Sequence, residues 1–152
     1  MLCEANIKVS WRTRPRGFTA LMGLYESNYL RFAQLAGDPA SLRGAAVSRV
    51  AGDCDLLLTV VEHMRYTTTL CLTYLFGRDQ SALERAPDLR LRAYHDARLL
   101  EAEQFRAPAH APRAPNFQPT AAERELHQRW QRNMMLNKWL EYCAERGHRF
   151  AR

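Results

Sequence analysis

The sequence lacks the short motifs that mark the commonest enzyme classes. It contains no Walker loop, no G-x-S-x-G, no H-E-x-x-H and no dinucleotide-binding glycine fingerprint. The missing phosphate-cradling glycines argue against a nucleotide-dependent enzyme. The histidines are also not spaced with a cysteine or with one another as a metal pair requires. We therefore expect no cofactor and no metal. The five histidines are His63, His95, His110, His127 and His148.

Long apolar runs and cysteine pairs at C-x-x-C spacing are also missing. No apolar run is long enough to span a bilayer, and the N-terminal stretch has charges but no apolar signal-peptide core. A chain of 152 residues buries enough apolar surface to fold without disulfides. We expect a cytoplasmic protein with no membrane partner, in which the cysteines are free thiols. The four cysteines are Cys3, Cys54, Cys71 and Cys143.

Lysine is scarce, although the chain is basic. Lysines and arginines number 22 against 16 acidic residues, a net charge of +6, and the only lysines are Lys8 and Lys138. This charge fits a polyanionic partner such as nucleic acid, or a composition that prefers arginine and needs only ordinary solubility. Because the arginines are spread along the chain, we favour the second interpretation.

The most regular pattern present is an alternation over Leu89–Phe105. Leu89, Leu91, Ala93, His95, Ala97 and Leu99 fall on one parity. A period of two predicts a strand with one packed and one solvated face. His95-Asp96 is a poor two-residue turn, because such turns favour glycine or asparagine. We therefore predict one long strand, with His95 buried and Tyr94 and Asp96 on the opposite face.

The remaining periodicities predict an α+β fold. Apolar residues at spacings of three and four indicate two helices, and runs of β-branched and aromatic residues indicate three further strands. The architecture is then an N-terminal helix, a four-stranded antiparallel meander and a C-terminal helix, with both helices on one sheet face. The predicted segments are helix 18–36, strands 45–51, 54–62 and 66–76, loop 81–88, and a helix from Thr120 to about Arg146.

These elements form one domain over residues 18–148. Residues 1–17 form a basic arm with no period, which we expect to be loosely ordered. Residues 106–119 contain Pro108, Pro112, Pro115 and Pro119, and they form a stiff crossover from the sheet to the last helix. Residues 149–152 are a short tail.

Three motifs together resemble the YqiB-like family of small bacterial proteins with a domain of unknown function. They are Arg65-Tyr66-Thr67-Thr68, Tyr94-His95-Asp96-Ala97 and Trp139-Leu140-Glu141-Tyr142-Cys143. Tyr25-Glu26-Ser27-Asn28-Tyr29 in the first helix fits the same pattern. The resemblance covers roughly residues 18–148. It implies a cytoplasmic bacterial domain with no established activity, and it brings no catalytic residue.

The best local set of candidate catalytic residues surrounds His95. An enzyme would use His95 as a general acid or base near neutral pH, oriented by a carboxylate. Adjacent strand residues point to opposite faces, however, so Asp96 cannot easily orient His95. We favour a core histidine bonded to backbone, with Asp96 paired to arginines outside. The full set is Glu62, His63, Arg65, Tyr66, Tyr94, His95 and Asp96.

Three functions follow, in decreasing order of support. The first is a non-catalytic interaction or regulatory module with an unknown protein partner, because no catalytic set is present. The second is weak, sequence-independent binding of nucleic acid, although the arginines lack interleaved aromatic residues. The third is an enzyme around Tyr94, His95 and Asp96. The oligomeric state stays open. The candidate nucleic-acid-binding residues are Trp11, Arg12, Arg14, Arg16, Arg90, Arg92 and Arg98.

Overall fold

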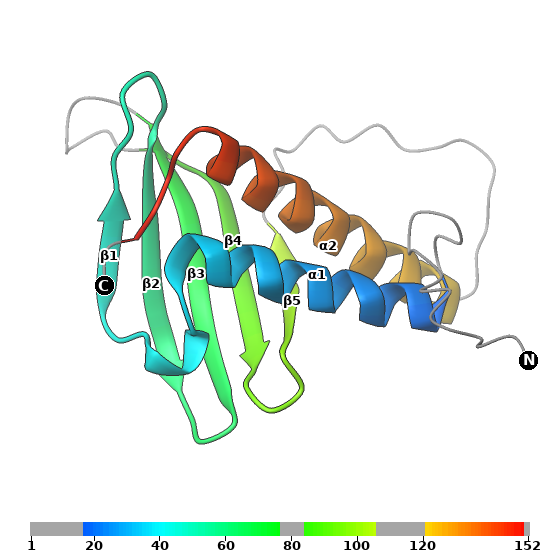
Figure 1. Ribbon diagram of the computed structural model, residues 1–152. Helices are drawn as coiled ribbons and strands as arrows, with labels where there is room; N and C mark the ends of the chain where they lie inside the picture. The colour runs from blue at the N-terminus through cyan, green and yellow to red at the C-terminus, as the bar shows by residue number, and fades with distance from the viewer. Residues whose placement is uncertain (1–16, 77–83, 106–120, 151–152) are drawn as a thin grey trace, which may run out of the picture.

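The protein folds as two helices packed on one antiparallel sheet (Figure 1). The computed structural model describes residues 17–76, 84–105 and 121–150. None of the helices in these ranges is long and apolar enough to cross a membrane. The elements, in chain order, are α1 Phe18–Ala36, the short 3-10 helix η1 Pro39–Ser41, β1 Ala45–Ser48, β2 Asp55–His63, β3 Thr67–Phe76, β4 Glu84–Tyr94, β5 Leu99–Phe105 and α2 Ala121–Glu145.

The sheet is an antiparallel meander in the order β1-β2-β3-β4-β5. Helices α1 and α2 lie side by side and cover one face of the sheet (Figure 1). The α+β class, the meander and the placement of both helices on one face are confirmed. The sheet has five strands, however, so the prediction of four is wrong.

Helix α1 has the predicted bounds because its ends are set by glycines. Gly17, in an extended conformation, precedes the first turn, and Gly37 ends the helix at φ 80° while donating its N–H to the Ala33 carbonyl. Positive φ suits glycine, which has no Cβ to clash. Asp38 then accepts a hydrogen bond from the Ala40 N–H and starts η1, whose first residue is Pro39. Gly147 follows the end of α2 and also has a positive φ, 89°.

The predicted long strand over Leu89–Phe105 is instead a hairpin. Strand β4 pairs with β5 from Tyr94 and Leu99 onward, and four residues, His95 to Arg98, form the loop. The buried side chains change parity across this loop, from Leu91 and Ala93 to Leu100 and Ala102. A four-residue loop does not need the glycine or asparagine of a two-residue turn. Arg98 supplies the left-handed residue of this loop, at φ 53°.

Strand β4 also begins earlier than predicted. Residues 84–88 belong to the strand, although the sequence suggested a loop over 81–88. The register with β3 shifts between Thr73 and Leu75, opposite the part of β4 that contains Pro87. A proline has no N–H for the ladder and is tolerated in a sheet mainly at bulges and edges. The bulge therefore lets the strand continue through Pro87.

The core lies between the sheet and the two helices. Its largest fully buried side chains include Phe32 of α1, Leu72 of β3 and Leu140 of α2. Phe150, beyond the expected domain range, is 7% exposed and donates its N–H to the Leu35 carbonyl. A smaller cluster joins the N-terminal halves of the helices through Leu21, Leu24 and Trp130, among others. The segment that follows α2 is therefore part of the packed structure.

Replacing Arg98 with glycine is expected to raise the free energy of unfolding by about 0.5–1 kcal/mol, because the left-handed conformation strains a residue with a Cβ. Asp96→Gly in the same loop is the matched control. Asp96 does not have a positive φ, so glycine there only adds freedom to the unfolded chain and should lower stability. Urea denaturation measures both variants. Equal effects of the same sign would contradict the assigned loop geometry.

Candidate functional site

The residues of the predicted site meet at one end of the sheet, where two hairpins turn. The β2–β3 turn and the β4–β5 loop are adjacent there, because the His95 N–H donates to the Tyr66 carbonyl. Thr68 Oγ1 lies 2.7 Å from His95 Nε2, and His95 Nδ1 lies 3.2 Å from the Arg65 carbonyl. A carbonyl only accepts, so Nδ1 carries the proton and Nε2 accepts from Thr68 in the neutral ring.

His95 is half-buried in the loop, so the prediction of a buried histidine inside a strand is wrong. The predicted bond to backbone is present, from Nδ1 to the Arg65 carbonyl. The ring centroids of His63 and His95 are 5.7 Å apart. His63 is exposed, and its Nε2 donates to the Ala40 carbonyl at 2.9 Å. The two histidines therefore link η1, the β2–β3 turn and the β4–β5 loop.

The carboxylates near His63 and His95 are not placed to orient His95. Asp96 is exposed in the loop, and no hydrogen bond joins it to His95 among the described side chains. Glu62 is exposed on β2. Tyr94 donates to Glu101 Oε1 at 2.6 Å, and burial together with this bond raises the pKa of Tyr94. The geometry brings His63, His95 and Arg65 together but does not assemble the acid–base pair.

Replacing His95 with alanine is expected to cost about 1 kcal/mol of stability, because Thr68 and the Arg65 carbonyl each lose a partner. Asp96→Asn should cost about 0.5 kcal/mol or less, since the side chain is exposed. Urea denaturation of both variants gives the comparison. Losses that are equally small would mean that the His95 bonds contribute nothing to the fold, which favours a functional role for this loop.

The arginines of β4 are partly neutralised by one glutamate of β5. Glu103 accepts from Arg92 Nε at 2.9 Å and lies 3.4 Å from Arg90 Nε. The alternation predicts that Arg98 shares a strand face with Arg90 and Arg92. Arg98 lies in the loop instead, so this prediction is wrong. Trp11, Arg12, Arg14 and Arg16 lie outside the described residues. Binding of nucleic acid through these side chains stays a prediction.

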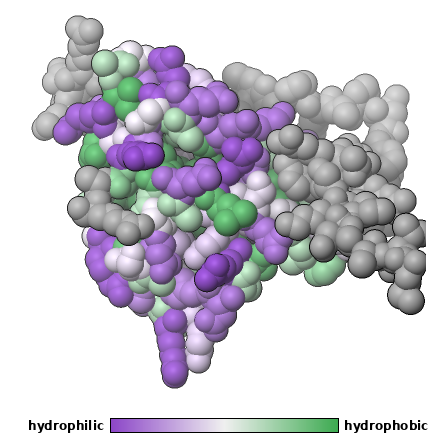
Figure 2. All heavy atoms as spheres, in the orientation of Figure 1, coloured by the Kyte–Doolittle hydropathy of each residue, from purple (hydrophilic) through white to green (hydrophobic). Residues whose placement is uncertain are grey.

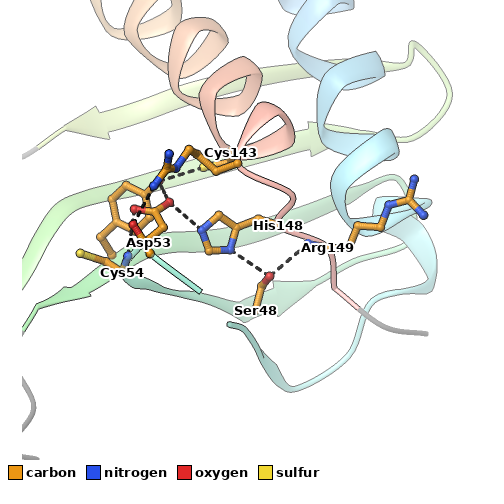
Figure 3. Close-up of polar contacts among 9 residues, drawn as sticks. Ser48, Asp53, Cys54, Cys143, His148 and Arg149 are labelled. Atoms are coloured by element: carbon orange, nitrogen blue, oxygen red, sulfur yellow. Dashed lines mark hydrogen bonds and ion pairs between the residues drawn. The ribbon is translucent and has the colours of Figure 1, made fainter. Parts of the chain in front are cut away.

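A buried polar network at the other end of the sheet was not predicted. His148, which follows the C-terminal cap of α2, is 1% exposed and lies between Asp53 and Ser48 (Figure 3). Its Nε2 lies 2.9 Å from Asp53 Oδ2, and its Nδ1 lies 3.0 Å from Ser48 Oγ. Ser48 Oγ also accepts from the Arg149 N–H, and Asp53 accepts from Tyr74.

Burial and hydrogen bonding have opposite effects on the pKa of Asp53. Burial would raise the pKa of Asp53, but hydrogen bonds from His148, the Cys54 N–H and Tyr74 together hold it below the usual value. Burial raises the pKa of Cys143 to about 11 and also raises the pKa of Tyr74, whose hydroxyl lies 3.5 Å from the Cys143 sulfur. Cys143 is therefore a neutral thiol at physiological pH.

The serine, histidine and aspartate have the chemistry of a hydrolase triad but not its accessibility. Ser48 is 3% exposed, and its oxygen is already held by a backbone N–H. A nucleophile must be reachable by substrate and sit beside a place for the oxyanion. The network instead ties the segment after α2 to the β1–β2 loop. The Arg146 guanidinium strengthens this tie by donating to the Gly52 carbonyl at 2.6 Å.

The sequence held only a faint signal for this network. Gly52-Asp53 is a typical turn sequence, Gly147 is a typical helix cap, and His148 directly follows that cap. The pairing of the turn with the cap requires the tertiary fold, since Asp53 and His148 are far apart in the chain.

Comparisons with known proteins add a family but no activity. The family model described as "Protein of unknown function (DUF1249)" matches residues 31–149. No curated protein and no solved structure matches the chain significantly. Within the described residues, no group of three or more histidine, cysteine, aspartate or glutamate side chains is arranged to hold a metal ion.

Proposed function

We propose that this chain, which belongs to the DUF1249 family of proteins of unknown function, is a non-catalytic module that binds another protein. One observation carries the proposal: three large apolar side chains are exposed within six residues at the β2–β3 hairpin. Val61 is 49% exposed, and Met64 and Tyr66 are each 55% exposed. The Arg65 guanidinium lies over the Tyr66 ring, 5.2 Å from its centroid.

Tyrosine, methionine and arginine are the residue types enriched in the centres of protein interfaces. They are grouped here on a hairpin whose turn is held by His63 and His95. A surface held in place before binding loses less entropy when a partner arrives. On the helices, the exposed large apolar side chains are spread over two elements instead of falling within six residues, and Figure 2 shows hydrophilic areas between the hydrophobic ones on this face. They are Phe18, Leu30, Met135 and Tyr142. We name Val61, Met64, Arg65 and Tyr66 the hairpin surface.

The test is capture of a partner from bacterial lysate by the full chain, with nuclease present, followed by direct binding with the purified partner. The double variant Met64→Ser/Tyr66→Ser should lose the partner while keeping its melting temperature, because both side chains are exposed. Leu30→Ser/Tyr142→Ser is the matched control, since it removes a similar pair of exposed side chains from the helices. This control variant should bind the same partner as the unchanged chain.

Three results would contradict the proposal. If the hairpin variant captures the same proteins as the unchanged chain, the hairpin surface is not the interface. If everything captured depends on nucleic acid and disappears with nuclease, the alternative function gains support, namely weak binding through the arginine-rich surface. Turnover of a substrate that is lost in His95→Ala would favour the second alternative, an enzyme.

The narrower placement in the YqiB-like group and a location in the bacterial cytoplasm are also proposals. The first is supported by the motifs at Arg65–Thr68, Tyr94–Ala97 and Trp139–Cys143. The second is supported by the thiols of Cys54 and Cys143, which form no disulfide, as is typical of a reducing compartment.

A further inference from the structure

The two edge strands of the sheet, β1 and β5, differ in whether their outward backbone groups are covered. On β5, the helices occupy the outward-facing backbone groups: Asn28 Nδ2 donates to the Leu100 carbonyl, and Asn133 Oδ1 accepts from the Ala102 N–H. Arg132 Nε also donates to the Ala102 carbonyl at 3.4 Å. Side chains that cover an edge in this way prevent another strand from pairing with it. Strand β5 is therefore a closed edge.

Strand β1 at the opposite edge has no such cover among the described residues. The Val60 N–H donates to the Gly44 carbonyl at 2.8 Å, and the register continues as Ala46 with Leu58 and Ser48 with Leu56. In an antiparallel pair, alternate residues bond to the partner strand and those between them point away.

The backbone N–H and C=O groups of Ala45 and Val47 therefore face outward. The described chain supplies no hydrogen bond to these four groups. Both residues are exposed, Val47 to 41%, and the strand itself contains neither proline nor charge. It is an open edge with an apolar side chain.

Three arginines surround this open edge. Arg43 precedes the strand, Arg49 follows it, and Arg149 is held beside it by the bond from its N–H to Ser48 Oγ. All three are exposed. Arg49 pairs with Asp55, whereas Arg43 donates to backbone carbonyls. Among the described residues, neither Arg43 nor Arg149 has a carboxylate partner.

The arginines disfavour a second copy of the chain as the occupant. Antiparallel pairing of two β1 strands about Val47 would place Arg49 opposite Ala45 of the other copy. Arg43 of that copy would then be its diagonal neighbour on the same face, about 7–8 Å away. This repulsion would occur twice in a symmetric pair. An acidic strand would meet attraction at the same positions.

We infer that the outer edge of β1 binds an extended segment of another protein, in which a short β-branched run is flanked by acidic residues. The segment would add a sixth strand through the outward groups of Ala45 and Val47, as in other cases of strand addition. Its acidic residues would face Arg43, Arg49 and Arg149. The hairpin surface takes no part, so the two proposals succeed or fail separately.

The test is an NMR titration of the full 15N-labelled chain with a blocked peptide, Glu-Thr-Val-Thr-Val-Glu. The amide signals of Ala45 and Val47 should shift and become protected from hydrogen exchange. The peptide in which lysine replaces both glutamates should bind roughly tenfold more weakly at low salt, and added salt should reduce the difference. Absence of any change at these amides at millimolar peptide, or equal binding of the two peptides, would overturn the inference.

Val47→Pro separates the edge from the sheet. Proline removes the outward N–H but no bond to β2, so the fold should survive and peptide binding should be lost. Val47→Thr keeps the N–H and the branched side chain and should bind normally. If Val47→Pro binds as well as Val47→Thr, the peptide does not add to β1. Amides of Ala45 and Val47 that are already protected in the free chain would show another occupant and would also overturn the inference.

Discussion

Replacing His148 with alanine is expected to lower the free energy of unfolding by about 3 kcal/mol. The imidazole is fully buried and bonds Asp53 and Ser48, so its removal leaves a cavity and takes one hydrogen-bond partner from each of these two side chains. Asp53 is affected most, because its charged side chain is only 10% exposed and loses its closest hydrogen-bond donor among side chains. Urea denaturation of His148→Ala measures the loss.

His127→Ala is the matched control, since His127 is exposed on α2 and should cost about 0.5 kcal/mol or less. Equal losses in the two variants would contradict the assigned network. A loss of activity without a loss of stability in His148→Ala would instead make the Ser48–His148–Asp53 set a functional site.

The same network predicts a pH dependence of stability. The folded state holds the pKa of Asp53 below its value in the unfolded chain, so folding favours the ionised carboxylate. Its contribution is complete above the unfolded pKa, about 3.9, and is lost as the pH falls through the lower folded value. The stability difference between the unchanged chain and Asp53→Asn should therefore be constant near pH 7 and shrink below about pH 4. A constant difference down to about pH 2 would show that the carboxylate charge contributes nothing.

Helix α1 and the strand order could be predicted from the sequence because their signals are local. The apolar spacing in residues 18–36 and the glycine at 37 set the helix, and β-branched runs separated by short turns set the meander. The hairpin between β4 and β5 was missed because its loop continues the alternation of the strand. Only the parity of Leu100 and Ala102 reveals it, and alanine and leucine neighbours on both parities conceal that change.

The candidate site was only partly predictable for a related reason. His63, Arg65 and His95 lie together because antiparallel pairing brings neighbouring turns to one end of the sheet, whereas the alternation predicted His95 inside a strand. The burial of each side chain could not be predicted, since the half-burial of His95 depends on its place in the loop. The networks of Ser48 with His148 and of Asn28 with α2 connect residues about a hundred positions apart. No periodicity in a single sequence encodes such pairs.

Replacing Asn28 with alanine is expected to cost about 2–3 kcal/mol, a loss second only to that of His148→Ala. Asn28 is 0% exposed and donates to the Leu100 carbonyl and Asn133 Oδ1, while its own Oδ1 accepts from Asn137 Nδ2 at 3.0 Å. Its removal takes the side-chain donor from the Leu100 carbonyl of β5 and one hydrogen bond each from Asn133 and Asn137 of α2, all at buried positions where a lost polar partner costs most.

The matched control is Glu26→Ala on the exposed side of the same helix, which should leave stability nearly unchanged. A double-mutant cycle with Asn137→Ala separates bonding from packing. Because the two asparagines share one bond, the double variant should lose less than the sum of the single losses, by about 1 kcal/mol. Strict additivity, measured by urea denaturation, would contradict the shared bond. It would mean that the tie between α1, α2 and the closed edge of β5 is made by apolar packing alone.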